Sequence, residues 1–168
     1  FDNVISALEK INYDKSFCLN LYNEPLADKK FINHISEIRN KLPKCIIQTN
    51  SNGDYIKNTN DLINLEKAGL NKIKITLHTP KKRDFSKDYM KASLNRFAKK
   101  LHFKLNTNHI SELNFNFRLG KLYVDVQCPN WFLDGNYRGE TLQNIKNIKK
   151  RNYPCVKPFR EFTIYYNG

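Results

Sequence analysis

A carboxylate stands where a buried strand gives way to a helix early in the sequence. The apolar, β-prone run of residues 16–22 stops at Asn23-Glu24-Pro25, and a helical pattern follows over about residues 29–41. Parallel α/β proteins bind their ligands at the carboxyl ends of their strands. The sequence therefore predicts that Glu24 lies at a ligand-binding edge, and capping of the following helix is the alternative role.

Two more strand-like runs end in polar residues. Residues 44–49 lead into the polar turn of residues 50–54, and residues 71–77 lead into His78-Thr79-Pro80. Because the ends of neighbouring parallel strands meet at one edge, their polar residues are candidates for the same site. The candidates are Thr49, Asn50, Ser51, Thr76 and His78. Ordinary turn chemistry and a polar strand end are the alternatives for these two segments.

Helical patterns separate these strands and position their ends. Helices are expected over residues 1–13, 29–41, 60–68 and within 81–101, with Asp28, then Thr59 or Asn60, as caps and Gly69 as a C-terminal stop. Three strand–helix units in series predict either a (β/α) barrel or an open doubly wound sheet. Two further strands, residues 113–119 and 121–127, are separated by Gly120 alone. They form a hairpin or one bent strand, which departs from a regular barrel.

Composition narrows the classes of partner. The chain has 168 residues, enough for one domain, and no apolar run approaches the roughly 20 residues that span a bilayer. No leader is visible, so the expected location is the cytoplasm. The net charge of +13 suits a nucleic acid, but the basic runs 81–83 and 149–151 lack interleaved aromatic residues. A small-molecule partner is therefore favoured over nucleic acid, and no membrane is expected.

The cysteines at positions 18, 45, 128 and 155 are too widely spaced for a CxxC motif. Cys18 and Cys45 are predicted to be small core residues because they lie in apolar, strand-like runs. Cys128 precedes a proline and is also interpreted as structural.

The order of these motifs resembles the radical SAM superfamily. The shared features are a strand ending in Asn-Glu-Pro, a second ending in Thr-Asn-Ser-Asn-Gly-Asp-Tyr, and Ala-Gly-Leu leading into Lys-Ile-Thr-Leu-His. The tail resembles the start of a SPASM extension, because Cys155 is followed, after residues 156–167, by Gly168. The segments Asn130-Trp131 and 135–139 resemble the region that precedes SPASM. The resemblance covers essentially the whole chain.

The resemblance implies a fold and a reaction. The fold would be α/β, a partial (β/α) TIM-like barrel of parallel strands cut at both ends, over residues 1–150, followed by a SPASM-like iron–sulfur extension over 151–168. The parent enzyme would be an oxidoreductase that reductively cleaves S-adenosylmethionine with a [4Fe-4S] cluster to abstract hydrogen from a peptide or small molecule. A reductant protein would be its electron-donating partner.

The resemblance also assigns roles to residues. Asn23-Glu24-Pro25 would match the family's Gly-Gly-Glu-Pro strand end, with Glu24 holding the ammonium of S-adenosylmethionine. Thr49 and Asn50, or Ser51 and Asn52, would lie near the ribose, and Thr76 and His78 near the carboxylate or ribose. Arg118 would pair with a carboxylate, a surface arginine being the alternative. Cys155 would be a ligand of an auxiliary cluster.

One family motif is missing from the sequence. No CxxxCxxC stands in the chain, and three thiolates are needed to hold the cluster while S-adenosylmethionine takes the fourth iron. The chain alone is therefore expected to be inactive. It is either the interior of a longer enzyme or a remnant with another role, such as a non-catalytic nucleotide- or partner-binding module or a basic nucleic-acid-binding domain.

Overall fold

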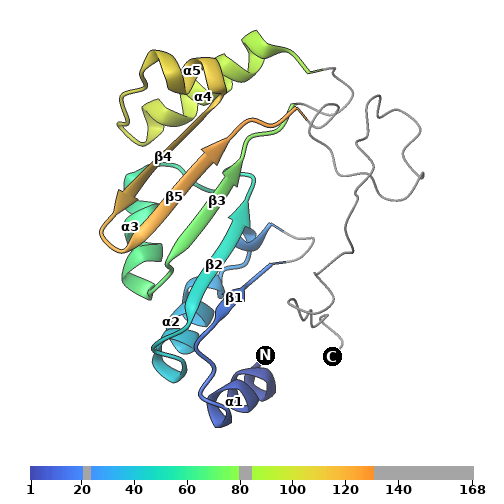
Figure 1. Cartoon of the computed structure of the whole chain (residues 1–168), viewed down its shortest axis with the longest axis vertical. Coiled ribbons are helices and arrows are strands. Elements are labelled where there is room, and N and C mark those ends of the chain that lie inside the picture. The colour runs from blue at the N-terminus through green and yellow to red at the C-terminus, as the bar shows by residue number, and fades with distance from the viewer. Residues whose placement is uncertain (21–23, 80–84, 131–168) are drawn as a thin grey trace, which may run out of the picture. The chain divides into compact units, whose positions relative to one another are not determined.

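The computed structural model describes residues 1–20, 24–79 and 85–130. These residues, except Asn130, belong to one compact unit, Phe1–Pro129. They form a mixed α/β structure around a five-stranded sheet in which parallel pairing dominates (Figure 1). The predicted boundary between residues 150 and 151 and the SPASM-like tail lie outside the described residues.

The strands are ordered β1-β2-β3-β5-β4 across the sheet. Their bounds are β1 Ser16–Cys18, β2 Ile46–Ser51, β3 Lys72–Thr76, β4 Asn114–Leu119 and β5 Leu122–Gln127. The pairs β1–β2, β2–β3 and β3–β5 are parallel, and β4 pairs antiparallel with β5. The carboxyl ends of β1, β2, β3 and β5 therefore meet at one edge of the sheet.

The helices predicted over residues 1–13, 29–41, 60–68 and within 81–101 are present, with ends that differ by three residues or fewer where bounds were predicted. The helical segments 25–27 and 107–112 were not predicted. Their bounds are α1 Asp2–Lys10, the 3-10 turn η1 Pro25–Ala27, α2 Phe31–Lys41, α3 Thr59–Ala68, α4 Lys87–Lys100 and α5 Thr107–Glu112. The cap of α3 is Asn58, in a capping box with Asp61, rather than Thr59 or Asn60. Gly69 ends α3 with φ +106°, as its expected role requires. None of the helices in the described ranges is long and apolar enough to cross a membrane.

The two faces of the sheet differ in character because side chains alternate along each strand. One face carries the buried residues Ile47, Ile73, Ile75, Val124 and Val126, and Figure 1 shows α2 and α3 behind the sheet on this side. The opposite face is mainly polar. We call it the polar face and define it by Asn50, Lys72, Lys74, Thr76, Asn116, Arg118, Tyr123, Asp125 and Gln127.

A tight hairpin interrupts the regular strand–helix series. Leu119 pairs with Leu122, so Gly120 and Lys121 alone form the turn, and Gly120 has φ +57°. The hairpin interpretation is therefore confirmed, and the single bent strand is wrong. Because β5 rather than β4 lies beside β3, β4 becomes an edge strand. The five described strands leave β1 and β4 as edges, so a closed or partial barrel stays a prediction.

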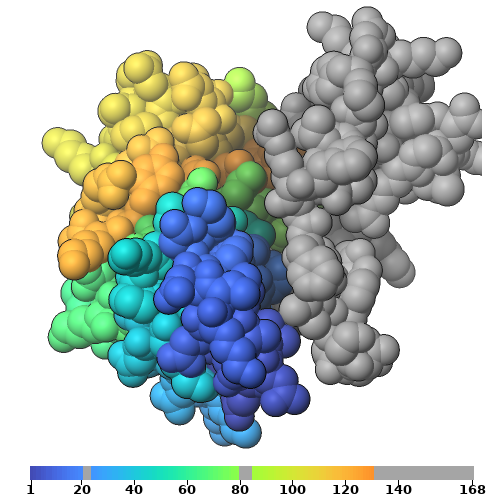
Figure 2. All heavy atoms as spheres, turned by 60° about the horizontal axis from the view of Figure 1, so that its bottom comes forward, coloured from blue at the N-terminus to red at the C-terminus, as the bar shows by residue number. Residues whose placement is uncertain are grey.

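Arg39 joins three segments at the end of the sheet where β2 and β3 begin. Its Nη1 donates to the carbonyl oxygens of Pro43 (2.7 Å) and Cys45 (2.9 Å), and its Nη2 donates to the carbonyl of Gly69 (2.9 Å) and to Asn71 Oδ1. Figure 2 turns this end of the molecule toward the viewer, with α1 in front. The guanidinium thus fixes the end of α2 against the starts of both strands.

Candidate functional site

Glu24 links the segment after β1 to the end of β2. Its Oε1 accepts hydrogen bonds from Ser51 Oγ (2.8 Å) and the backbone N–H of Leu26 (3.2 Å), and its Oε2 accepts from the N–H of Asn52 (2.7 Å). The bond to Leu26 caps the 3-10 turn η1. The alternative role, capping of the helix over about residues 29–41, is not what Glu24 does, since that helix begins after Lys30 without a side-chain cap. A carboxylate offers about four acceptor positions. The three bonds therefore leave about one acceptor position for a ligand.

Asn20 is the residue that sequence reasoning missed. Its Oδ1 accepts from the backbone N–H of Asn50 (2.8 Å), Thr49 Oγ1 (3.2 Å) and Cys18 Sγ (3.3 Å). The side-chain amide continues the β1–β2 ladder after the strand itself has ended at Cys18. The predicted strand over 16–22 is therefore too long. An asparagine inside an apolar run was the available signal.

The three predicted residues at the end of β2 do not point the same way. Thr49 and Ser51 are 2% and 5% exposed and lie on the helix-covered face. Asn50, between them, is exposed on the polar face. Thr49 and Ser51 therefore hold Asn20 and Glu24 in place, and Asn50 is the member of this group with a side chain turned to the polar face.

The end of β3 brings Thr76 to the same edge. Thr76 Oγ1 accepts a hydrogen bond from Gln127 Nε2 of β5 (3.4 Å), and both residues belong to the polar face. Asn50 of β2 pairs with Lys74 of β3, so Thr76 lies two residues further along β3 on the same face. His78 is exposed two residues further on. Glu24, Asn50 and Thr76 thus lie at the carboxyl edge of β1, β2 and β3. Asn50 and Thr76 are on the polar face, whereas Glu24 bonds Ser51, whose side chain lies on the helix-covered face.

Other predicted residues lie elsewhere. Arg118 pairs with Tyr123, which pairs with Lys72 at the start of β3, so it lies at the opposite end of the sheet from Thr76. This placement follows from the antiparallel direction of β4. Pro25 is buried and begins η1. Asn23 and Cys155 lie outside the described residues.

The cysteines that the structure describes are not arranged as ligands. Cys45 is buried and its Sγ donates to the carbonyl of Lys15 (2.9 Å), while burial raises the pKa of the Cys128 thiol to about 12. Cys18 is exposed, so its predicted core position is wrong. Residues 1–20, 24–79 and 85–130 contain no group of three or more His, Cys, Asp or Glu that could hold a metal ion. These residues therefore do not fit an iron–sulfur cluster.

Comparisons with known proteins give a distant structural similarity. No family model matches the sequence, and no curated protein matches it. Two matching crystal structures are of BtrN, one of the selenomethionine protein in an open conformation and one in complex with AdoMet and 2-DOIA. The first is 16% identical with a TM-score of 0.45 and covers 73% of this chain and 50% of that one. The second is 14% identical with a TM-score of 0.46 and covers 75% and 42%. The chain thus spans half or less of the length of the structures it matches.

Proposed function

We propose that this chain is a segment of a radical SAM enzyme and that the carboxyl edge of β1, β2 and β3 binds S-adenosylmethionine. The observation that carries the proposal is the gathering of Glu24, Asn50 and Thr76 at one edge of three adjacent parallel strands. Ligands of open parallel sheets bind at this edge. The same residues belong to the ordered strand-end motifs that resemble the radical SAM superfamily.

The described side chains suit the polar groups of this cofactor. The remaining acceptor position of Glu24 would take the ammonium group, because a carboxylate and an ammonium form a charge-assisted hydrogen bond. The exposed amide of Asn50 and the hydroxyl of Thr76 would serve the ribose and the carboxylate. Asn20 and Ser51 act indirectly, by fixing the backbone of Asn50 and the carboxylate of Glu24.

The chain's own part in this proposal is binding rather than cleavage. Its described thiols do not form a cluster site, so we expect it to bind S-adenosylmethionine without cleaving it. The longer cytoplasmic enzyme would have a partial barrel, a SPASM-type extension that includes Cys155, a peptide or small-molecule substrate and a reductant protein. A CxxxCxxC motif in the coding sequence ahead of Phe1 would support catalysis. Its absence there would leave a non-catalytic nucleotide-binding module.

Calorimetric titration with S-adenosylhomocysteine tests the binding site directly. The Asn50→Ala change removes an exposed amide at the proposed site and should weaken binding about threefold to tenfold, the effect of one hydrogen bond. Asn60→Ala, at an exposed position of α3, is the matched control and should leave affinity unchanged. No binding heat at millimolar ligand, or equal weakening in both variants, would reject the site.

A further inference from the structure

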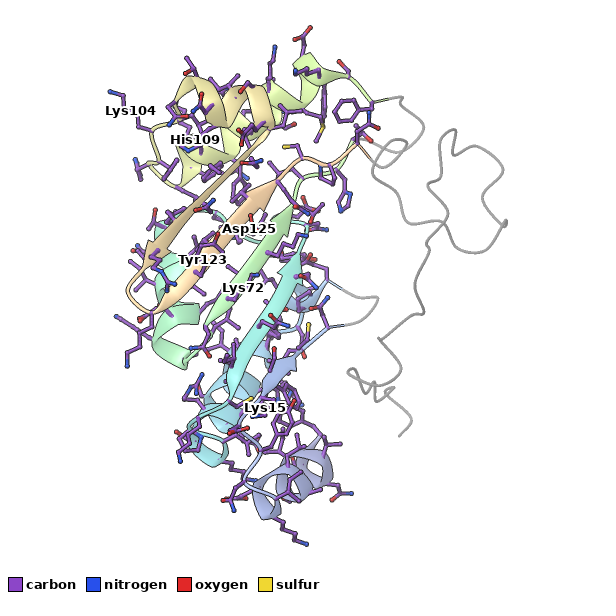
Figure 3. The ribbon with its side chains drawn as sticks, in the orientation of Figure 1. Lys15, Lys72, Lys104, His109, Tyr123 and Asp125 are labelled. Carbon is purple, nitrogen blue, oxygen red and sulfur yellow. The ribbon has the colours of Figure 1, made fainter. Side chains whose placement is uncertain are left out.

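The polar face carries a band of cationic side chains that begins beside the proposed cofactor edge, where Lys74 pairs with Asn50, and runs toward the start of β3. Two rows of side chains cross β3, β5 and β4 in that order. The first row is Lys72, Tyr123 and Arg118, and the second is Lys74, Asp125 and Asn116. Figure 3 shows Lys72, Tyr123 and Asp125 along the neighbouring strands β3 and β5. Three cations therefore share this part of the face with the single carboxylate of Asp125.

These charges are not neutralised within the described part of the chain. Its ion pairs join Asp14 to Lys15, Glu37 to Lys41 and Asp88 to Lys91, all outside the polar face. Lys74 and Asp125 are register partners, yet no ion pair within 4.0 Å joins them. The band thus keeps a formal excess of two positive charges, counting three cations against one carboxylate.

Tyr123 contacts two of the cations. Lys72 Nζ lies 5.7 Å and Arg118 Cζ 5.6 Å from the centroid of its ring, each on a strand that flanks β5. Cations at this distance are attracted to the face of an aromatic ring. The ring therefore helps to position both cations on the strands, and Lys74 adds a third next to them.

We infer that the polar face binds the phosphate group of a small phosphate-bearing substrate through Lys72, Lys74 and Arg118. A phosphate monoester carries about −1.5 to −2 charges near neutral pH, which matches the excess of two positive charges. Lysine binds phosphate as a point charge, and arginine binds it with paired donors. Asp125 lies beside Lys74 on β5. Its carboxylate would accept a hydrogen bond from a hydroxyl of the same molecule. The inference rests on the proposed function, because it places the substrate on the same sheet as the cofactor.

A phosphate titration of the full chain followed by amide NMR tests this assignment. At constant ionic strength, inorganic phosphate should shift amides of β3 and β5 saturably, with chloride giving no such shifts. Lys72→Gln should weaken phosphate binding about tenfold, the effect of one charged hydrogen bond. Lys67→Gln, at an exposed position of α3, removes the same charge and should leave binding unchanged. Equal weakening by both variants, or shifts scattered over many lysines, would overturn the inference.

Two further titrations separate this inference from the proposed function. Lys72→Gln should bind S-adenosylhomocysteine like the unaltered chain, because Lys72 lies at the start of β3, at the opposite end of that strand from Thr76. Binding of the nucleoside without phosphate binding refutes the phosphate site alone, whereas localised phosphate binding without the nucleoside refutes the proposed function alone. Binding of a single-stranded RNA that Lys72→Gln and Lys67→Gln weaken equally, with no localised phosphate shifts, would identify the band as general basic charge and overturn the inference.

Discussion

Replacing Glu24 by glutamine should lower stability as well as ligand binding. Glutamine keeps one acceptor oxygen and adds an NH2 donor, so it cannot accept from Ser51, Leu26 and Asn52 as the carboxylate does. If its oxygen replaces Oε1, its NH2 meets the N–H of Asn52, and that backbone donor loses its partner. An unsatisfied donor costs about 1–3 kcal/mol, and the loss of charge assistance adds to this. We expect a loss of about 2 kcal/mol in the free energy of unfolding.

Urea unfolding followed by far-ultraviolet circular dichroism measures this loss. A decrease of about 2 kcal/mol corresponds to roughly 6 °C in melting temperature for a domain of this size. Glu37→Gln is the matched control, since it removes only a helix-surface pair with Lys41 and should cost about 0.5 kcal/mol or less. Ser51→Ala should fall between the two, near 1 kcal/mol. Equal unfolding free energies for Glu24→Gln and Glu37→Gln would refute the structural role of the carboxylate.

Two other predictions concern the scaffold. Arg39→Lys should lose about 3 kcal/mol in chemical unfolding, because one ammonium nitrogen cannot bond all of the acceptors that the guanidinium joins. Arg96→Lys, on the exposed side of α4, is the control and should change stability by less than about 0.5 kcal/mol. With iodoacetamide at pH 9 and mass-spectrometric detection, exposed Cys18 should be alkylated first, and Cys128, with a pKa of about 12, should keep only about one thiolate in a thousand and stay unmodified. Equal labelling of Cys18 and Cys128 would contradict this burial.

Apolar periodicity and helix-end chemistry were enough to predict most of the elements. The alternating residues of β3 and the glycine after α3 have local causes, so they could be recognised without knowing the fold. The partner of each strand is not a local property. Whether Gly120 makes a hairpin depends on pairing between β4 and β5, which places β4 outside the series that the first three strands predict.

The shared edge of the candidate residues was predictable, but their contacts were not. Parallel strand ends must share an edge, and this placed Glu24, Asn50 and Thr76 together in advance. The hydrogen bonds of Asn20 depend on where β1 stops, and the end of a short strand is poorly specified by its own sequence. The position of Arg118 depended on the direction of β4, which the alternating pattern leaves open.

The strands that carry the polar face also limit how it can respond to a ligand. Lys72, Lys74, Tyr123 and Asp125 lie on β3 and β5, which are paired on both sides within the sheet, rather than on loops. Their backbones are already ordered, so an incoming molecule would immobilise little more than side-chain rotamers. Affinity at such a surface would come at a small entropic cost, and free and bound backbones should superimpose within about 1 Å.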